Sequence, residues 1–234
     1  MTIIEDLTTK ELVALIDNKN LKIIDVRPVD AYNGWKLENE LRGGHIKGAK
    51  SLPLKWTKYM DWIEIVRSKH ILPEHQIVVY GYTSEQSQAV AMFFLKAGYQ
   101  DVFVYNLFIE EWAGNEDLPL EKLERYRQLV YPDWVKTIIG GGIPLEHKGG
   151  KTVICHAHYR NREAYLSGHI PGAIDIDTLA LEAPEIWNRR TPEELKISLE
   201  KHGITTDTTV VLYGKFMSPD NDDEFPGSAA DVLG

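Results

Sequence analysis

The sequence contains an internal repeat, and this feature restricts the possible folds more than any other. The hexapeptide Gly-His-Ile-Lys-Gly-Ala at Gly44–Ala49 recurs as Gly-His-Ile-Pro-Gly-Ala at Gly168–Ala173. An apolar run that ends in Tyr-Gly occurs at residues 77–81 and again at residues 210–214. Landmarks that recur in the same order indicate two homologous domains rather than one.

The spacing of the landmarks supports this interpretation. The sequence distance from Tyr32 to Tyr165 equals the distance from Tyr80 to Tyr213. The two hexapeptides are closer together than this, because the first copy carries a short insertion around residues 33–43. A longer stretch after the second hexapeptide restores the spacing.

Each copy alternates short apolar strands with amphipathic helices. In the first copy a helix is predicted after Thr8-Thr9, which are good N-cap residues. Further strands and helices are predicted at residues 22–26, 77–80, 87–97, 102–105 and 109–112, and in the second copy at 134–139 and 193–202. Continuous apolar strands separated by helices predict an α/β fold in which each parallel sheet has helices on both faces.

The predicted organisation is a first domain, a helical linker and a second domain, at residues 1–114, 115–130 and 131–234. The second copy has nothing that corresponds to Val102–Trp112 of the first. A sheet that lacks a strand exposes backbone groups and apolar surface. We therefore expect the chain to end inside its second domain, so that the native protein is longer or a separate chain completes the sheet.

Charge and hydropathy exclude several classes of partner. The chain has 26 Lys+Arg against 35 Asp+Glu, a formal net charge of −9, which disfavours a nucleic-acid partner. No apolar run is long enough to span a membrane. The first residues lack the basic and apolar regions of a signal peptide, which predicts a cytoplasmic protein, although a processed exported form would begin in the same way.

These landmarks resemble the rhodanese (sulfurtransferase) family. In the first copy Asp25-Val26-Arg27 is followed by Tyr32 and then by Gly44–Ala49, and the second copy has the family hexapeptide in full at Gly168–Ala173. Its equivalent of Asp-Val-Arg is expected at His158-Tyr159-Arg160. The resemblance covers nearly the whole chain and implies tandem α/β domains, each with a five-stranded parallel sheet, of which only one is active in many members.

The family chemistry depends on a cysteine directly after the Val-Val-Tyr strand. Backbone N–H groups of the following loop hold its thiolate or persulfide, which takes sulfur from a donor such as thiosulfate. The first loop of this chain instead reads Gly81-Tyr82-Thr83-Ser84-Glu85-Gln86, and the second begins Gly214-Lys215-Phe216-Met217. Neither loop can carry a persulfide, and the related phosphatases, which also need the cysteine, are disfavoured equally.

The remaining polar residues of these motifs are expected to be structural. Thr83 and Ser84 have no evident base beside them, so a capping or turn role is favoured over a nucleophilic one. His45 and His169 hold the same motif position, which favours imidazole hydrogen bonds to local backbone. In the family Asp25 and Arg27, and by analogy Arg160, help to hold the loop.

Cys155 is the only cysteine, so no disulfide can form within the chain. It lies in an apolar run at the start of the second copy, where a small buried core residue is favoured over a reactive thiol. His156 and His158 flank it and would need a further ligand to hold a metal. We expect neither a metal nor a cofactor.

Two functions are favoured by these motifs and residues. In the first, the chain forms the non-catalytic domains of a persulfide-transferring protein of the thiosulfate sulfurtransferase type, inactive alone, with a sulfur-acceptor protein or a downstream catalytic rhodanese domain as partner. In the second, it is a pseudoenzyme, a regulatory module that binds a protein or a small anion. A hydrolase that uses Ser84 is a third, weaker alternative.

Overall fold

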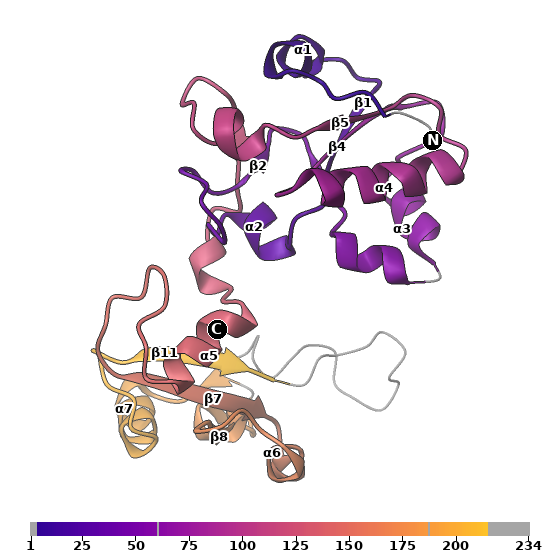
Figure 1. Cartoon of the computed structure of the whole chain (residues 1–234). Coiled ribbons are helices and arrows are strands. Elements are labelled where there is room, and N and C mark those ends of the chain that lie inside the picture. Colours follow the sequence, from indigo (N-terminus) through magenta and orange to yellow (C-terminus); the bar gives the residue numbers. More distant parts are fainter. Residues whose placement is uncertain (1–3, 60, 187, 215–234) are drawn as a thin grey trace. The chain divides into compact units, whose positions relative to one another are not determined.

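The computed structural model describes residues 4–59, 61–186 and 188–214 (Figure 1). The chain divides into two compact units, Met1–Tyr131 (unit 1) and Pro132–Gly234 (unit 2). In the described residues, no helix combines the length and the apolar character that a membrane crossing needs.

Unit 1 is built on a parallel sheet with the strand order β3-β1-β4-β5 (Figure 1). The strands are β1 (Leu21–Asp25), β3 (Lys50–Ser51), β4 (Gln76–Tyr80) and β5 (Val102–Tyr105). Asp25 lies opposite Tyr80, and Tyr80 lies opposite Tyr105. The carboxyl ends of the three longer strands therefore meet at one edge of the sheet, and the loops that follow them share that edge.

Helices cover both faces of this sheet, as the apolar strands predict. They are α1 (Thr9–Leu15), α2 (Val29–Asn33), α3 (Trp62–Ser68), α4 (Ser84–Lys96), the 3-10 helix η1 (Leu54–Lys58) and the π-helical turn η2 (Phe108–Trp112). Successive side chains of a strand point to opposite faces. Ile77 and Val79 of β4 belong to a core with α3 and α4, whereas Val78 and Tyr80 belong to a second core with α1 and η2.

Helix α4 begins three residues earlier than the sequence pattern predicts, at Ser84 rather than Ser87. Thr83 is its N-cap, and the Thr83 side chain accepts a hydrogen bond from the Gln86 backbone N–H. The first turn carries polar residues only, so apolar periodicity does not detect it. The predicted loop Gly81–Gln86 therefore consists of Gly81, Tyr82, the N-cap Thr83 and the first turn of α4.

Residues 115–130 do not form the predicted helical linker but belong to unit 1. Strand β6 (Leu120–Glu121) pairs in antiparallel fashion with β2 (His45–Ile46), and a 3-10 helix, η3 (Tyr126–Gln128), follows. Tyr126 is buried with its ring edge-on to Trp35. These long-range contacts override the local helical preference of a charged segment.

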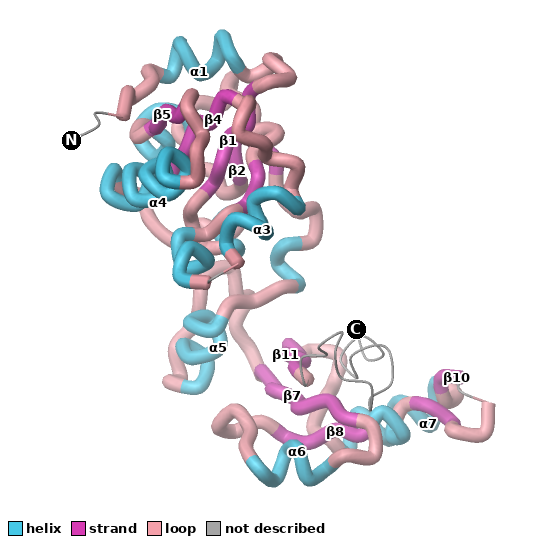
Figure 2. Tube along the Cα trace, turned by 90° about the vertical axis from the view of Figure 1, so that its right-hand side faces the viewer, coloured by secondary structure: helices cyan, strands magenta, loops and turns pink. Residues whose placement is uncertain are grey.

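Unit 2 has a three-stranded parallel sheet in the order β11-β7-β8 among its described residues (Figure 2). Its elements are α5 (Pro132–Ile139), β7 (Thr152–His158), α6 (Arg162–Ser167), β8 (Ile174–Asp177), the 3-10 helix η4 (Thr178–Ala180), the pair β9 (Glu182–Ala183) and β10 (Asn188–Arg189), α7 (Pro192–Lys201) and β11 (Thr209–Tyr213). A small core joins Cys155 and Ala157 of β7 to Ile176 and Ile204. The part of the predicted second domain that follows residue 214 lies outside the described residues.

Candidate functional site

The candidate site of unit 1 is the loop between β4 and α4. Gly81 is buried directly after β4, and Tyr82 is partly buried. Thr83 then caps α4, so the backbone N–H groups of the loop and of the first helical turn lie close together. Such a loop can hold an anion, because the N–H dipoles there converge.

In this chain the side chain of Gln86 closes the loop from within. Its Oε1 accepts a hydrogen bond of 3.1 Å from the Tyr82 backbone N–H. A Cβ atom built on Gly81 would lie 3.1 Å from the same Oε1 and 2.9 Å from Cγ2 of Val26. A side chain at the position of the family cysteine would therefore require Val26 and Gln86 to shift. The Gln86 amide oxygen also accepts the Tyr82 N–H, a donor that would otherwise be free to face an anion.

Tyr82 is held by a carboxylate from the insertion at residues 33–43. Its hydroxyl donates a 2.5 Å hydrogen bond to Oε1 of Glu40. Glu40 is buried and also accepts from the backbone N–H groups of Leu37 and Glu38. Burial raises the pKa of Tyr82, and the hydrogen bond to Glu40 raises it further, so the phenol stays protonated near neutral pH.

Arg27 lies fully buried beneath this loop. Its Nε and Nη2 donate to the two carboxylate oxygens of Asp25 at 3.0 and 2.7 Å, and Nη2 also donates to the Gly44 carbonyl at 2.6 Å. The ring of Phe108 lies 4.1 Å from its guanidinium carbon. Burial lowers the pKa of Arg27, but the charge and hydrogen bond of Asp25 together with Tyr80 and Tyr82 outweigh this effect, and the net pKa is raised.

Arg27 is therefore an internal cation rather than a receptor for an oxyanion. Asp25 accepts a further hydrogen bond of 2.7 Å from the Tyr80 hydroxyl, so its charge is shared between an arginine and a tyrosine. The remaining guanidinium nitrogen, Nη1, has no hydrogen-bond partner and lies 4.0 Å from Glu40. A buried group of this kind maintains the loop, and the loss of one partner would leave an uncompensated charge.

Ser84 and Glu85 lie at the start of α4. Ser84 Oγ accepts from Nε2 of Gln88, an amide donor that cannot take the hydroxyl proton. Glu85 is exposed, and hydrogen bonds to its own backbone N–H and to Thr83 lower its pKa. These contacts are those of residues in the first turn of a helix, and none of them activates the Ser84 hydroxyl as a nucleophile.

His45 and His169 occupy matching turns in the two units. Nδ1 of His45 lies 2.7 Å from the Tyr32 carbonyl, and the two rings are stacked with centroids 3.6 Å apart. Nδ1 of His169 lies 3.0 Å from the carbonyl of Tyr165, whose ring is stacked at 3.9 Å. Each histidine thus connects the hexapeptide turn to the helix that precedes it, α2 in unit 1 and α6 in unit 2.

The strand register corrects the expected position of the Asp-Val-Arg equivalent in unit 2. Asp25 lies opposite Tyr80, whereas Tyr213 lies opposite His156. The equivalent of Asp25-Val26-Arg27 is therefore His156-Ala157-His158. Arg160, expected at the position of Arg27, is exposed in the connection that follows β7. This connection is longer than its counterpart in unit 1, so counting back from Tyr165 misplaces the motif.

The two histidines replace the buried ion pair of unit 1. Nδ1 of His158 accepts from the Asn161 backbone N–H, and its Nε2 lies 3.8 Å from Asp175. Nδ1 of His156 and Nε2 of His158 are buried without a hydrogen-bond partner. Burial lowers the pKa of His156, and the neighbouring His158 lowers it further. Gly214 follows β11, while Lys215, Phe216 and Met217 lie outside the described residues.

Cys155 lies at the centre of β7 with its side chain in the core of unit 2. Burial raises the pKa of its thiol to about 11, which leaves little thiolate at neutral pH. Within the described ranges, no three His, Cys, Asp or Glu side chains gather as they would around a metal ion.

Comparison with known proteins supports the resemblance seen in the motifs. The family described as rhodanese-like domain matches residues 8–115. The thiosulfate sulfurtransferase YnjE of Escherichia coli (strain K12) is 32% identical over 203 residues, which are 86% of this chain and 45% of YnjE. The chain belongs to the rhodanese family. As a family member it is sulfurtransferase-like. Gly81 and Gly214, however, stand at the two positions where the family chemistry needs a cysteine.

Solved structures show which rhodanese proteins share the fold. The anaerobic ergothioneine biosynthesis enzyme from Chlorobium limicola, in complex with trimethyl histidine, is 58% identical with a TM-score of 0.91. The wild-type structure of EanB matches with the same identity and TM-score. Each match covers 97% of this chain and 53% of the other chain. The rhodanese chain described here thus spans about half the length of these relatives.

Sequence reasoning located this rhodanese loop but missed the residues that close it. Glu40 lies in the insertion and reaches Tyr82 only through the fold. The sequence places Gln86 in the loop, but only the fold shows that its side chain accepts the Tyr82 N–H and fills the loop. Arg42, also in the insertion, donates to the carbonyl groups of Trp112, Ala113 and Leu118. The insertion at residues 33–43, which interrupts the repeat, is the sequence feature that could have drawn attention to Glu40 and Arg42.

Proposed function

We propose that this chain provides non-catalytic rhodanese units of a persulfide-transferring protein, and that polypeptide other than these units carries the reactive cysteine. The observation that carries the proposal is the closed loop of unit 1. The Gln86 side chain occupies it, and a side chain at Gly81 would require Val26 and Gln86 to shift. Gly81 itself offers no thiol on which a persulfide could form.

The only thiol of the chain supports the same proposal. Cys155 lies in the core strand β7, not in a loop with converging N–H groups. Burial raises its pKa, whereas a sulfur-transferring cysteine needs a lowered one. Sulfur transfer through Cys155 would require the core of unit 2 to open.

Both units are assigned to the rhodanese fold in this proposal, with domains at residues 1–114 and 131–234. The recurring turn contacts support the assignment. The hydroxyl of Tyr32 donates to Ala49 at 2.9 Å, and that of Tyr165 donates to Ala173 at 2.9 Å. The family match itself covers residues 8–115.

The acceptor we propose for the whole protein is a trimethylated histidine. Support comes from the 58% identity to EanB, which has been solved with hercynine and, in one variant, with ergothioneine covalently linked to a cysteine persulfide. The alternative of a small-anion sensor has less support, because an amide oxygen already occupies the loop of unit 1.

The test measures sulfur transfer by this chain alone. The chain and its Cys155→Ser variant are incubated with thiosulfate and cyanide, and separately with polysulfide and hercynine, with formation of thiocyanate and ergothioneine followed. We expect both proteins to match the protein-free blank in both assays. Activity that disappears in Cys155→Ser would overturn the proposal, because Cys155 would then be a sulfur carrier.

A further inference from the structure

The helices on the two faces of the unit 1 sheet carry charges of opposite sign. Helix α1 and the turn η2, which share one core, contain three carboxylates and one cation: Glu11, Glu110 and Glu111 against Lys10. On the other face, η1, α3 with its two cap residues and the last turn of α4 contain five cations and two carboxylates: Lys55, Lys58, Arg67, Lys69 and Lys96 against Asp61 and Glu64. This second face is therefore positive in a chain whose formal net charge is −9.

The lysines of this face are not neutralised by neighbouring carboxylates. Arg67 donates to Glu64 at 3.0 Å, so these two charges compensate each other. Within the ranges that the structure describes, no carboxylate oxygen lies within 4.0 Å of the amino group of any of the four lysines. Uncompensated charges of one sign at a surface attract and orient a partner of the opposite sign.

Aromatic rings lie beside these lysines. The amino group of Lys69 lies 5.7 Å from the centre of the Trp56 ring, and that of Lys96 lies 5.9 Å from the centre of the Phe93 ring. Trp62 connects the two places, because its ring centre is 5.8 Å from that of Phe93 and Trp56 packs against the core to which Trp62 belongs. The three elements η1, α3 and α4 thus present amines and rings on one continuous surface.

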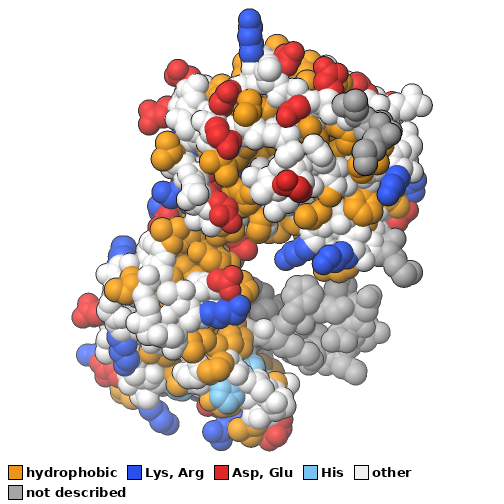
Figure 3. All heavy atoms as spheres, viewed as in Figure 1, with side chains coloured by type: hydrophobic (Ala, Val, Ile, Leu, Met, Phe, Trp, Pro, Cys, Tyr) orange, Lys and Arg blue, Asp and Glu red, His pale blue; other side chains and the backbone are white. Residues whose placement is uncertain are grey.

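Two of the aromatic side chains are open to solvent. Phe93 is 39% exposed, and Tyr59, between η1 and α3, is 54% exposed. Figure 3 shows Lys and Arg side chains beside apolar ones on unit 1. Exposed aromatic rings supply the apolar anchor contacts of many interfaces. We define the lysine-aromatic face by these two rings and the four lysines, which are Lys55, Lys58, Tyr59, Lys69, Phe93 and Lys96.

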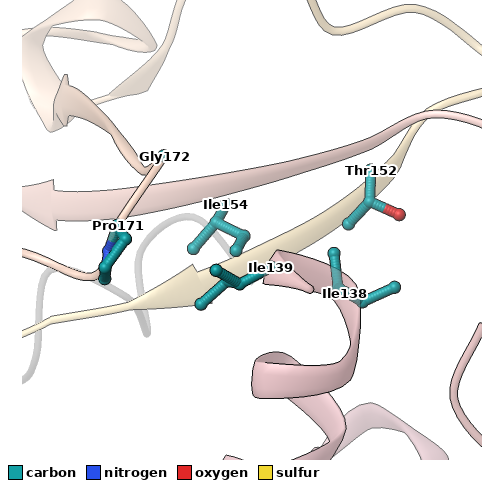
Figure 4. Close-up of a pocket in the computed structure, with 6 residues that line it drawn as sticks. All are labelled: Ile138, Ile139, Thr152, Ile154, Pro171 and Gly172. Atoms are coloured by element: carbon teal, nitrogen blue, oxygen red, sulfur yellow. The ribbon is translucent and has the colours of Figure 1, made fainter. Parts of the chain in front are cut away.

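The groove of unit 2 offers no comparable signal. Figure 4 shows that two isoleucines of α5, two residues of β7 and the turn before β8 line it. These residues are Ile138, Ile139, Thr152, Ile154, Pro171 and Gly172. None of the six carries a charge, so they do not favour one class of partner. The lysine-aromatic face, in contrast, specifies both the charge and the apolar character of what it can bind.

We propose that the lysine-aromatic face binds an acidic segment of a separate protein, whose carboxylates meet the lysines while an apolar side chain contacts Phe93 and Tyr59. Complementary charge sets the orientation of such a partner, and the exposed rings anchor it. A nucleic acid fits less well, because a long polyanion is repelled by the negative net charge of the chain. The inference uses unit 1 alone and is independent of the sulfur chemistry proposed above.

The experiment titrates the full chain into a fluorescent peptide made of Glu-Glu-Phe repeats and follows its anisotropy. A Gln-Gln-Phe peptide and a Glu-Glu-Gly peptide of the same length separate the contributions of charge and of apolar contact. We expect the Glu-Glu-Phe peptide to bind at least tenfold more tightly than either of the other two. Its affinity should fall as salt is added, because salt screens the exposed charges.

Charge reversals on the two faces of the sheet locate the binding. Lys58→Glu combined with Lys96→Glu should weaken binding of the Glu-Glu-Phe peptide at least tenfold, and Tyr59→Ser should reduce its advantage over the Glu-Glu-Gly peptide. Lys10→Glu on α1 combined with Lys19→Glu is the matched control, because it changes the net charge equally, and it should leave most of the affinity. All five side chains are exposed, and thermal unfolding confirms that each variant is folded.

Three results would overturn the proposal. One is a Glu-Glu-Phe peptide that does not bind, or that binds equally to the two charge-reversed proteins. Another is a single-stranded oligonucleotide that binds more tightly than the peptide and is released by Lys58→Glu with Lys96→Glu, which would make a nucleic acid the partner. The third is an oligomer in sedimentation that dissociates in the same variant, which would make a second copy of the chain the occupant.

Discussion

One atom, Oε1 of Gln86, determines what the loop after β4 can hold. It accepts from the Tyr82 N–H, and it lies within 3.1 Å of the position that a Cβ on Gly81 would take. Val26 approaches the same position from the strand side at 2.9 Å. A larger residue at this site would therefore displace Val26 and Gln86, and restoring the family cysteine alone would leave the Gln86 side chain in the loop.

This argument predicts the effect of Gly81→Cys. The added side chain must displace Val26 and Gln86, and such overpacking costs about 1–3 kcal/mol of unfolding free energy. We expect a lower midpoint in urea and no thiosulfate–cyanide activity. Gly114→Cys is the control, because the nearest atom to a Cβ there is 3.5 Å away. A stable, active Gly81→Cys protein would contradict the assignment of the loop as closed.

His156 gives unit 2 a pH dependence. Burial lowers the pKa of the folded imidazole below its ordinary value of 6.5, so the unfolded chain binds the proton first as the pH falls. Stability therefore rises with pH, and this contribution is fully present above 6.5 and is lost as the pH falls through and below that value. Chemical unfolding between pH 8 and pH 5 should show this loss in the unchanged chain and a flatter profile in His156→Asn. Equal slopes for the two proteins would exclude His156 as the cause.

At the scale of elements, α4 depends on the cap that precedes it. Thr83 accepts the Gln86 N–H and thereby fixes both the start of the helix and the residue that closes the loop. Thr83→Ala should lower the unfolding free energy by about 1 kcal/mol, and Thr83→Ser should restore most of it. Urea unfolding measures both. If alanine and serine gave the same loss, packing of the threonine methyl rather than the cap would explain the effect.

The elements show how far sequence reasoning reaches. Apolar runs predicted β4 and β5 to within a residue, because these strands are buried on both faces and carry no conflicting signal. Residues 115–130 were mispredicted because their structure depends on β2, Trp35 and Arg42, which are distant in sequence. The same holds for the candidate site. The absence of the cysteine can be read directly from the sequence, whereas the contacts of Gln86 and Glu40 with Tyr82 form only in the folded chain.

At the scale of the whole molecule, the two units differ in how completely their sheets are covered. The β4 strand of unit 1 is interior and has an extensive core on each face. The described sheet of unit 2 has three strands, a smaller core and a partly exposed β11. Since burial of apolar surface is the main favourable contribution to folding, unit 1 should be the more stable of the two.

Scanning calorimetry of the full chain should therefore resolve two unfolding transitions, with that of unit 2 at the lower temperature. Leu12→Ala, at a fully buried position of α1, should lower only the upper transition, and Ile204→Ala, in the core of unit 2, only the lower one. Each substitution removes a buried aliphatic side chain at a cost of about 2–5 kcal/mol, which is large enough to move the midpoint by several degrees. A single transition that responds to both substitutions would mean that the units unfold together. Two separate transitions, with the lower one moved only by Ile204→Ala, would instead show that the smaller described core of unit 2 unfolds independently of unit 1.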